Sequence, residues 1–598
     1  MNKKLLLFMF VLITGFSLQA QVTYYVNAAT GNDSNDGSQA KPWATLNPGA
    51  WASGTDDCII NIAPGDYFLD AMTRIEVNAQ IIGTSKDEVA LMGEGDEDFW
   101  DDSRGEYPLT GGAFYVPEGS SLTLKNLTLK NQRRANANGG SIKVEWGATL
   151  TLENVDLLNS ICLAGAGGAV DCDGTLDFKN VLIQGCYAPQ SVIGMFTNAA
   201  RSDDGTVRGK FENSRFVENE SLTNGIFNME ANMGIDVSFN NCIFERNKMG
   251  GYGAVLRFGV YENMFVKAHV TNSAFLENVG KDACCMAMYT NISRNREIDL
   301  YVANCTYYRN VMSGAHSVVF TVNLTANNTM TGSMVFVNNA IINNGKIDGT
   351  TEATTIAIPD FTVHTVFINN VMFAERDEQV RSVPVVLWDE MNPAGGAWRT
   401  RTILGNFVDN VGGSSNQVAP FRDTEINTMI ARQVLDDEGV QVNAKIFETL
   451  GIKRGLVYPE GGGVPYFELL EGSPLINNPK SQNEVMINGK NVVPQTDVRG
   501  KAIIGTKEVG PFEYDPDGSS IIRPQVINED ILAYPNPFNE ILLLKKEVKK
   551  VEIFNTTGIL CISALNPSKI NTSKLSQGIY LVRVTEFDGS VRTIKMKK

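Results

Sequence analysis

Several features are scarce in this 598-residue chain, and each scarcity argues against a class of function. Only 3 residues are histidine, and none of the 9 cysteines forms a Cys-x-x-Cys pair, so a zinc site is not indicated. Lys and Arg number 51 against 67 Asp and Glu, and the net charge of −16 argues against nucleic acid and anionic membranes as partners. Beyond the N-terminus no apolar run approaches the roughly 18 residues of a transmembrane helix.

The N-terminus itself has the pattern of a secretory signal. Lys3 and Lys4 supply the positive start, and an apolar stretch follows from Leu5 to Phe16. Ala20 is a small residue suited to the cleavage position. The sequence therefore predicts a signal peptide at residues 1–20 and an exported mature chain.

One short pattern recurs through the middle of the chain: an apolar residue, any residue, asparagine, two residues, and another apolar residue. The stretch LTLKNLTLKN at 122–131 is its first instance. The asparagines of the series are Asn126, Asn154, Asn180, Asn213, Asn241, Asn272, Asn304, Asn338 and Asn370. Self-similarity at a period of about 30 residues is typical of stacked-repeat architectures.

Each repeat predicts a strand, a corner and a second strand. Alternation with period two precedes the asparagine, and the in/out phase shifts after it. Asparagine adopts the left-handed conformation more readily than other residues except glycine, and its amides can stack from coil to coil. With glycine-led strands such as GGSIKV instead of helices in each repeat, the pattern predicts an all-β, right-handed parallel β-helix.

The outward positions of these strands are the first place to look for a site. Three residues before successive asparagines the chain places Asp177, Lys210, Ser238, His269 and Tyr301. This row is a candidate track for an extended polymer, and the alternative interpretation is a mixed polar surface ladder. In the next coils Val335, Val337 and Phe367 occupy positions expected to face outward. Because all three are apolar, we expect a cover over them, drawn from segment 376–450.

Two acidic segments are candidate calcium sites, since oxygen ligands suit Ca²⁺. Segment 93–107, GEGDEDFWDDSRGEY, combines seven carboxylates with three aromatic residues. Segment 31–37, GNDSNDG, lacks the full calcium-loop pattern and favours a turn. Ca²⁺ is a possible cofactor at either place, with solvated acidic loops as the alternative, and no metal ligand is assigned.

The last 75 residues do not continue the asparagine repeat and indicate a separate domain. Short alternating strands separated by Asn, Gly and Ser turns predict a small Ig-like β-sandwich. The stretch resembles the C-terminal sorting domain of type IX secretion cargo in Bacteroidetes. The matching residues are Tyr534, Pro535, Asn536, Pro537, Phe538, Gly578, Ile579 and Tyr580. The resemblance implies export across the outer membrane to the cell surface or medium, with the secretion machinery and its sortase as partners. The predicted domains are 21–515 for the β-helix, 516–525 for a linker and 526–598 for the sorting domain.

Two further stretches resemble pectate-lyase-like β-helix proteins of the bacterial surface. Residues 24–46 with 60–69 resemble the opening of such proteins, and 472–479 with 496–514 resemble the closing segment. Paired Asp and Gly-His-Gly motifs of the pectin hydrolases are not found, so the catalytic residues are unknown. The leading hypothesis is a non-catalytic glycan-binding, adhesive or structural rod. The alternative is a polysaccharide lyase acting on uronate glycans by β-elimination, with a base drawn from Lys267, His269, Tyr301, Arg257 or Arg294.

Overall fold

The computed structural model divides the chain into two compact units, Met1–Ile522 and Arg523–Lys598, which are described separately. It describes residues 21–598 except for these segments: 70, 94–110, 136, 198–204, 261–264, 291–295, 315–316, 325–329, 347–353, 360–363, 374–384, 391–398, 404–423, 432–445, 460–461, 480, 488, 515–532, 535–540, 545–547, 556–559, 568 and 586–590. The predicted boundaries at 515, 516 and 525 lie in one of these gaps and stay predictions.

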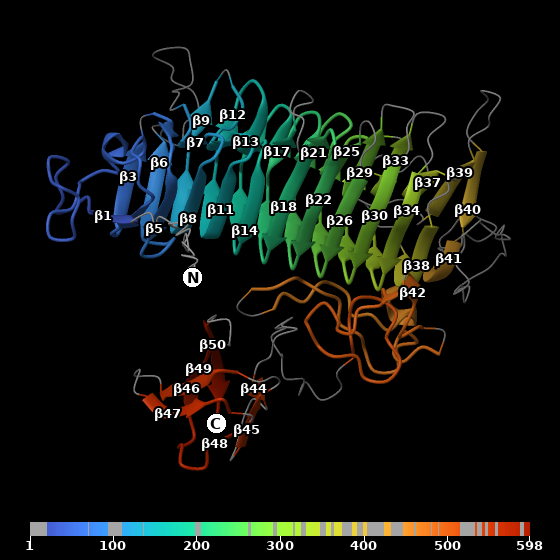
Figure 1. Cartoon of the computed structure of the whole chain (residues 1–598). Coiled ribbons are helices and arrows are strands. Elements are labelled where there is room, and N and C mark those ends of the chain that lie inside the picture. The colour runs from blue at the N-terminus through green and yellow to red at the C-terminus, as the bar shows by residue number, and fades with distance from the viewer. Residues whose placement is uncertain are drawn as a thin grey trace, which may run out of the picture. The chain divides into compact units, whose positions relative to one another are not determined.

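The first unit is a parallel β-helix built from three long sheets, seen side-on in Figure 1. The 21-stranded sheet bends at the corner of every coil. Its strands that precede or run through the corners are β8 (Ser121–Lys130), β11 (Thr149–Leu158), β14 (Thr175–Lys179), β18 (Thr206–Glu212), β22 (Gly234–Asn240), β26 (Phe265–Thr271), β30 (Arg296–Ala303), β34 (Met330–Val337) and β38 (His364–Phe373). Separate strands follow the corner as β15 (Leu182–Gln184), β19 (Arg215–Val217), β23 (Ile243–Glu245), β27 (Ala274–Leu276), β31 (Thr306–Tyr308) and β35 (Ala340–Ile342). Its remaining strands are β1 (Val22–Val26), β2 (Cys58–Ile62), β3 (Gly65–Leu69), β5 (Asn78–Gly83), β6 (Val89–Gly93) and β41 (Thr424–Ala431).

The other two sheets complete each coil. The 12-stranded sheet contains β4 (Thr73–Arg74), β7 (Phe114–Val116), β10 (Ile142–Val144), β13 (Ala166–Cys172), β17 (Ser191–Phe196), β21 (Gly225–Ala231), β25 (Ala254–Val260), β29 (Met286–Thr290), β33 (Ser317–Leu324), β37 (Thr354–Pro359), β39 (Val385–Glu390) and β40 (Arg399–Ile403). The 8-stranded sheet contains β9 (Arg133–Arg134), β12 (Ile161–Cys162), β16 (Tyr187–Ala188), β20 (Glu220–Ser221), β24 (Lys248–Met249), β28 (Val279–Gly280), β32 (Val311–Met312) and β36 (Gly345–Lys346). The 3-10 helix Pro48–Ala50 and α1 (Ile446–Thr449) belong to the same unit.

The bend of the 21-stranded sheet is made by the asparagines of the repeat. Asn126, Asn154, Asn180, Asn213, Asn241, Asn272, Asn304 and Asn338 all have left-handed backbones, with φ between 50° and 57°. The ninth predicted corner was placed one residue too late. There the left-handed residue is Asn369, with φ of 53°, and its amide donates to Asn338 Oδ1 at 3.1 Å. Asn370 instead faces inward and accepts from Asn339 Nδ2 at 2.9 Å.

Stacked aromatic side chains fill the middle of the β-helix. Phe211 and Phe239 lie parallel with ring centroids 4.6 Å apart. A second stack runs through Phe244, Phe275 and Tyr307 at 4.6 and 4.8 Å. All five are fully buried. Successive coils are thus joined by ring-on-ring contacts in addition to backbone hydrogen bonds.

A second column of amides, which the repeat pattern did not reveal, runs inside the β-helix. This inner asparagine ladder lies six residues after the corner positions and consists of Asn219, Asn247, Asn278, Asn310 and Asn344. Each Nδ2 of the first four donates to the Oδ1 of the next member at 2.8–3.1 Å. The residue before each is also left-handed, as at Glu218 and Arg246. Every coil of this region therefore turns two tight corners, and the inner ladder satisfies the polar groups at the second.

The cysteines behave as small core residues. Eight of them are buried thiols: Cys58, Cys162, Cys172, Cys186, Cys242, Cys284, Cys285 and Cys305. Burial raises the pKa of Cys186, Cys242 and Cys305 to about 12. These side chains pack as small apolar residues.

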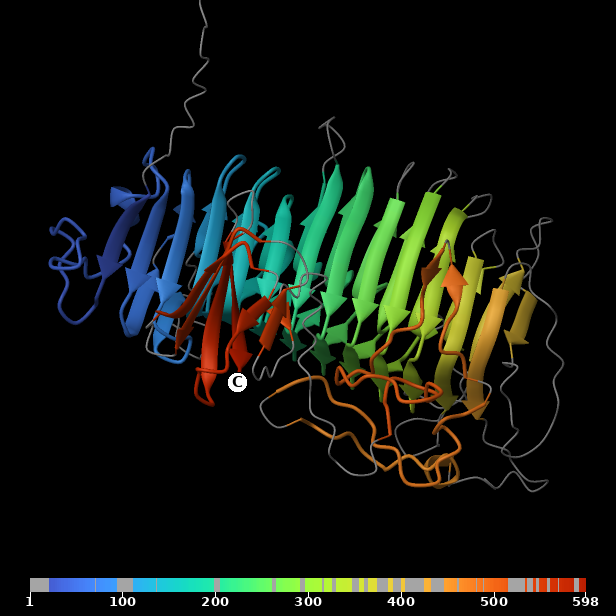
Figure 2. The ribbon, with the colours of Figure 1, turned by 60° about the horizontal axis from the view of Figure 1, so that its bottom comes forward.

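The segment from Ile446 to Tyr514 closes the unit and lies along the outside of the later coils (Figure 2). Its hairpin, β42 (Met486–Ile487) and β43 (Lys490–Asn491), sits over the outward face of β30 and β34. Val335 and Val337 pack there against Val485, Ile487, Val492 and Val493. The prediction that segment 376–450 covers these valines is therefore wrong, because residues 485–493 cover them. Phe367 was assigned outward through the same one-residue slip that misplaced Asn370, and it stacks inside on Phe336 at 5.0 Å.

The second unit is a small β-sandwich. One sheet contains β44 (Ala533–Tyr534), β45 (Ile541–Leu544) and β48 (Lys569–Asn571). The other contains β47 (Leu560–Leu565), β46 (Lys550–Asn555), β49 (Ile579–Thr585) and β50 (Val591–Lys597). Both sheets contribute to one core that includes Leu542, Ile570, Val551 and Val582. The predicted fold class, a right-handed parallel β-helix followed by a small β-sandwich, is confirmed.

Candidate functional site

The five residues of the predicted track lie side by side on the outer face of the 21-stranded sheet. Asp177 is in register with Lys210, Lys210 with Ser238, Ser238 with His269, and His269 with Tyr301. Asp177 and Lys210 are exposed, while Ser238, His269 and Tyr301 are half-buried. Because neighbouring parallel strands lie about 4.8 Å apart, the row offers one polar or aromatic side chain at each step along the rod.

The row ends where the hairpin β42–β43 arches over the sheet. Tyr301 Oη donates to the backbone carbonyl of Val492 at 2.8 Å, and burial raises the pKa of this phenol. Beside it lies a cavity of about 320 Å³. Its polar lining comes from His269, Glu297, Asp299, Ser333, Lys490 and Asn491. The row therefore runs from exposed surface to a cavity whose lining includes two carboxylates and one lysine.

Charges next to the track largely neutralise one another. Lys267 Nζ lies 3.6 Å from Asp236 Oδ2 on the preceding strand. His269 Nε2 lies 3.6 Å from Asp299 Oδ2 on the following strand. Further along, Lys210 Nζ is 3.1 Å from Glu212. Each of these basic groups already faces a carboxylate, so the surface presents hydrogen-bonding capacity without an excess of positive charge.

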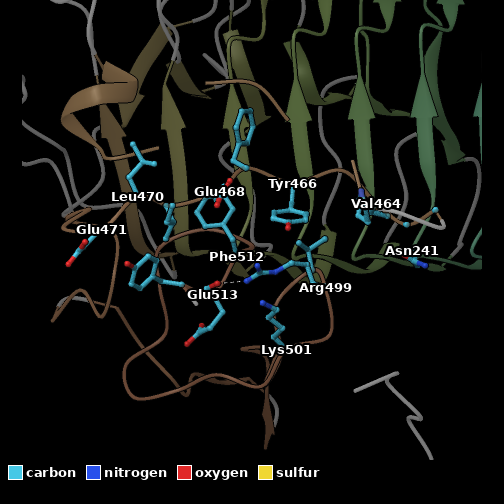
Figure 3. Close-up of a pocket in the computed structure, with 17 residues that line it drawn as sticks. Asn241, Val464, Tyr466, Glu468, Leu470, Glu471, Arg499, Lys501, Phe512 and Glu513 are labelled. Atoms are coloured by element: carbon cyan, nitrogen blue, oxygen red, sulfur yellow. Dashed lines mark hydrogen bonds between the residues drawn. The ribbon is translucent and has the colours of Figure 1, made fainter. Parts of the chain in front are cut away.

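A larger pocket of about 670 Å³ lies within the closing segment (Figure 3). The guanidinium carbon of Arg499 lies 4.8 Å from the centroid of the Tyr466 ring. Its Nη2 lies 2.5 Å from Oδ2 of the buried Asp497. Burial, and a hydrogen bond with Glu508, raise the pKa of Glu513 to about 8. Lys507 Nζ lies 3.7 Å from Glu513. These contacts lie within the closing segment, so Arg499 and Glu513 already have partners in the chain.

The acidic segments give no metal site among the described residues. Almost all of 93–107 falls outside them. In 31–37, Asp33 accepts hydrogen bonds from Ala44 N, Thr45 N and Thr45 Oγ1 at 2.9 Å each, and Asp36 accepts from Ser38 N at 3.0 Å. This segment is a hydrogen-bonded turn. Where the structure describes the chain, no group of three or more His, Cys, Asp or Glu residues could hold a metal ion.

The sequence predicted the row of five residues, which are in register, but missed most of the cavity beside it. Asp299 and Glu297 could have been found, because they occupy outward positions two and four residues before Tyr301. Lys490 could not have been found, because no pattern in the sequence around Tyr301 indicates that a hairpin nearly 200 residues later folds back over β30. Of the bases considered for β-elimination, Arg257 lies on the 12-stranded sheet, away from the track, and Arg294 lies outside the described residues.

The residues of the predicted sorting motif lie on two sheets of the second unit. Tyr534 is in β44, paired with Leu543. Gly578 directly precedes β49, which begins with Ile579 and Tyr580; Tyr580 is buried and its Oη donates to the carbonyl of Ser576 at 2.9 Å. Pro535, Asn536, Pro537 and Phe538 lie outside the described residues. Throughout the described chain no helix is long and apolar enough to span a membrane.

Comparison with known proteins identifies the second unit. Residues 532–596 match the family described as "Secretion system C-terminal sorting domain". The chain is therefore a cargo of the type IX secretion system, exported across the outer membrane to the cell surface. No curated protein matches the sequence.

Solved structures similar to the β-helix are distant. Pectin methylesterase PemA from Erwinia chrysanthemi is 11% identical, with 38% of this chain and 79% of that chain covered and a TM-score of 0.18. The GH136 lacto-N-biosidase from Eubacterium ramulus is 11% identical, covering 61% and 67%, with a TM-score of 0.24. The tailspike protein gp49 from Acinetobacter baumannii bacteriophage Fri1 is 12% identical, covering 90% and 73%, with a TM-score of 0.24. Matches this distant say nothing about substrate or activity.

Proposed function

We propose that the exported β-helix binds an extended, uncharged glycan along the track, without chemical turnover. The observation that carries the proposal is the unbroken row from Asp177 to Tyr301 on five adjacent strands, ending at the cavity beside the β42–β43 hairpin. A polymer of hydroxyl-bearing rings can use a carboxylate, an amine, a hydroxyl and an imidazole in turn as hydrogen-bond partners. The recess at the end would hold one terminal unit.

The charge pattern favours a neutral ligand over a polyuronate. Binding a chain of carboxylates requires cations that are not already compensated. Lys267 and His269 face Asp236 and Asp299, and a uronate would have to compete with these resident carboxylates. Glu297 and Asp299 in the cavity would also repel an acidic sugar.

The lyase alternative has less support for a related reason. β-Elimination needs a group that can accept a proton near neutral pH. The Tyr301 hydroxyl donates a hydrogen bond to Val492 O, and burial raises its pKa, so the phenol remains protonated. Lys267 is paired with Asp236. Of the other bases, His269 lines the cavity with its Nε2 3.6 Å from Asp299 Oδ2, and Arg294 lies outside the described residues.

The test is a titration of the mature chain with neutral hexasaccharides and with oligogalacturonate, followed by calorimetry and by absorbance of unsaturated ends. We expect binding of a neutral oligosaccharide, weakened at least about tenfold by Ser238→Arg and by His269→Ala, the equivalent of roughly 1.4 kcal/mol. Thr123→Ala is the matched control, because Thr123 holds the same place in a coil two strands before Asp177. Oligogalacturonate cleavage that His269→Ala abolishes would establish the lyase instead. Equal affinity in all variants would refute the track.

A further inference from the structure

The pocket of the closing segment has no role in the proposed glycan track. Its volume of about 670 Å³ exceeds the roughly 320 Å³ of the cavity beside Tyr301, and it falls in the range of about 300–1,000 Å³ that is typical of ligand sites. Val464 and Val498 of its lining belong to the same apolar cluster as Ile243, which follows the corner at Asn241. The track precedes that corner, so the pocket and the track lie on different faces of the β-helix.

Part of the lining of this pocket is apolar. Val464, Val498 and Phe512 are buried, and Leu470 lines the pocket while remaining 45% exposed. These four side chains are called the apolar wall below. Because removing apolar surface from water is favourable, an apolar group of a ligand that packs against this wall would stabilise a complex.

Three hydrogen-bonding groups belong to residues that line the same pocket, namely Tyr466 Oη, Tyr514 Oη and Arg499 Nη1. Arg499 Nε donates to Asp497 Oδ2 at 2.6 Å, and Nη2 donates to the carbonyl of Glu513. Arg499 Nη1 and the two hydroxyls make no hydrogen bond to any described residue, and all three are accessible to solvent. Figure 3 shows Tyr466 and Arg499 next to each other in the pocket. A ligand in the pocket can therefore use these groups.

The charged groups around the pocket largely compensate one another. Arg499 Nη2 lies 2.5 Å from Asp497 Oδ2, and Lys453 Nζ lies 2.7 Å from Glu468 Oε2. The carboxyl of Glu513 keeps its proton at neutral pH, because burial raises its pKa to about 8. The other charged residues of the lining are one of each sign, Lys501 and Glu471. The pocket therefore favours an uncharged ligand over an acidic one.

We propose that this pocket binds a neutral N-acetylated amino sugar, with the acetamido methyl group against the apolar wall and oxygen atoms hydrogen-bonded to Tyr466, Tyr514 and Arg499. An acetamido group combines a methyl group, a carbonyl acceptor and an N–H donor in one small substituent, which matches a site with apolar and hydrogen-bonding groups side by side. A hydroxyl in the same place offers no apolar contact. The inference rests on the proposed function for its class of ligand, but it uses no residue of the track.

The experiment titrates the full mature chain calorimetrically with two β-1,4-linked hexamers, one of N-acetylglucosamine and one of glucose, which differ only in the acetamido group. We expect the N-acetylglucosamine hexamer to show a binding event whose dissociation constant rises at least about tenfold in Tyr466→Phe and in Leu470→Ser. The same event should be unchanged in His269→Ala, which alters only the track. The glucose hexamer should lack the event.

The matched controls are Tyr458→Phe and Ile504→Ser. Both residues are exposed on the closing segment, and neither lines the pocket, so each control repeats one substitution outside the site. We expect unchanged binding in both controls. Melting temperatures should be the same in all four variants, because Tyr466→Phe keeps the ring and Leu470 is partly exposed. Weakening by the controls equal to that in the pocket variants would refute the site.

The remaining outcomes separate the pocket from the track. An event weakened by His269→Ala but by neither pocket variant would establish the track as the saccharide site and refute the pocket. Weakening by the pocket variants, with no event that His269→Ala weakens, would support the pocket and contradict the track. Equal binding of the two hexamers would refute the acetamido preference. No heat with the N-acetylglucosamine hexamer would mean that water alone occupies the pocket.

Discussion

Removing one amide of the inner asparagine ladder gives the sharpest test of how the coils are held together. In Asn247→Ala the backbone N–H of Asn219 loses its acceptor, at 3.0 Å, and the carbonyl of Phe216 loses its donor, at 2.8 Å. The hydrogen bonds from Asn219 Nδ2 to Asn247 Oδ1 and from Asn247 Nδ2 to Asn278 Oδ1 also disappear. Two buried backbone groups left without partners, at about 1–3 kcal/mol each, give an expected loss of roughly 2–6 kcal/mol.

The matched control is Asn241→Gly at the preceding corner of the same coil. Asn241 has φ of 56°, which glycine adopts freely, and its amide makes a single partly exposed bond to Asn213. We expect a loss of about 1 kcal/mol there. Urea unfolding followed by circular dichroism compares the two variants, provided the slope against urea stays constant. Hydrogen exchange of the Asn219 amide reports the local effect. An Asn247→Ala variant no less stable than Asn241→Gly, with that amide still protected, would refute the reasoning.

Three further predictions concern the core, the closing segment and the second unit. Phe239→Asp places an unpaired charge in the ring stack on Phe211 and should abolish cooperative melting, and an unchanged melting curve would contradict the buried stack. Because the pKa of Glu513 is raised to about 8 from an ordinary 4.5, native Glu513 keeps a proton that the unfolded chain releases, so this group lowers stability as pH rises through that window. Glu513→Gln, which can keep the bond from Ile504 N, should therefore raise the melting temperature more at pH 8 than at pH 5, and an equal shift at both would refute the assignment. Deleting 524–598 should leave the β-helix folded but retained in the periplasm, as fractionation and limited proteolysis would show; surface display of the truncated chain would contradict the sorting role.

The sequence predicts the coil architecture because one residue type does one conformational task in every repeat. A left-handed corner favours asparagine strongly, so the period can be read directly from positions such as Asn126 and Asn154. The same logic fails in the ninth coil. Both Asn369 and Asn370 have apolar residues two before and three after, so local pattern alone cannot choose between them. The choice depends on which amide lies beneath Asn338, a contact between coils.

The second corner of each coil could not be predicted from the sequence, because no single residue type marks it. Its left-handed position is held by different residue types, such as Glu218, Arg246 and Gly185, so no single letter repeats there. The signal that could have found it is the asparagine one residue later, as in Asn219 and Asn247. The cover over Val335 required knowledge of a fold-back from residues 485–493, and apolar outward positions alone indicate that something covers them but not what does.

The eight buried thiols affect how the chain behaves on its way out of the cell. Oxidation and disulfide exchange proceed through the thiolate, and in Cys186, Cys242 and Cys305 a pKa of about 12 almost eliminates this form at neutral pH. An unfolded copy in the periplasm would instead offer every one of these sulfurs to the oxidising machinery there. Rapid folding therefore protects the thiols chemically. A chain that folds before it meets an oxidant keeps its cysteines buried and reduced. A chain that stays unfolded can form disulfides that the β-helix cannot accommodate.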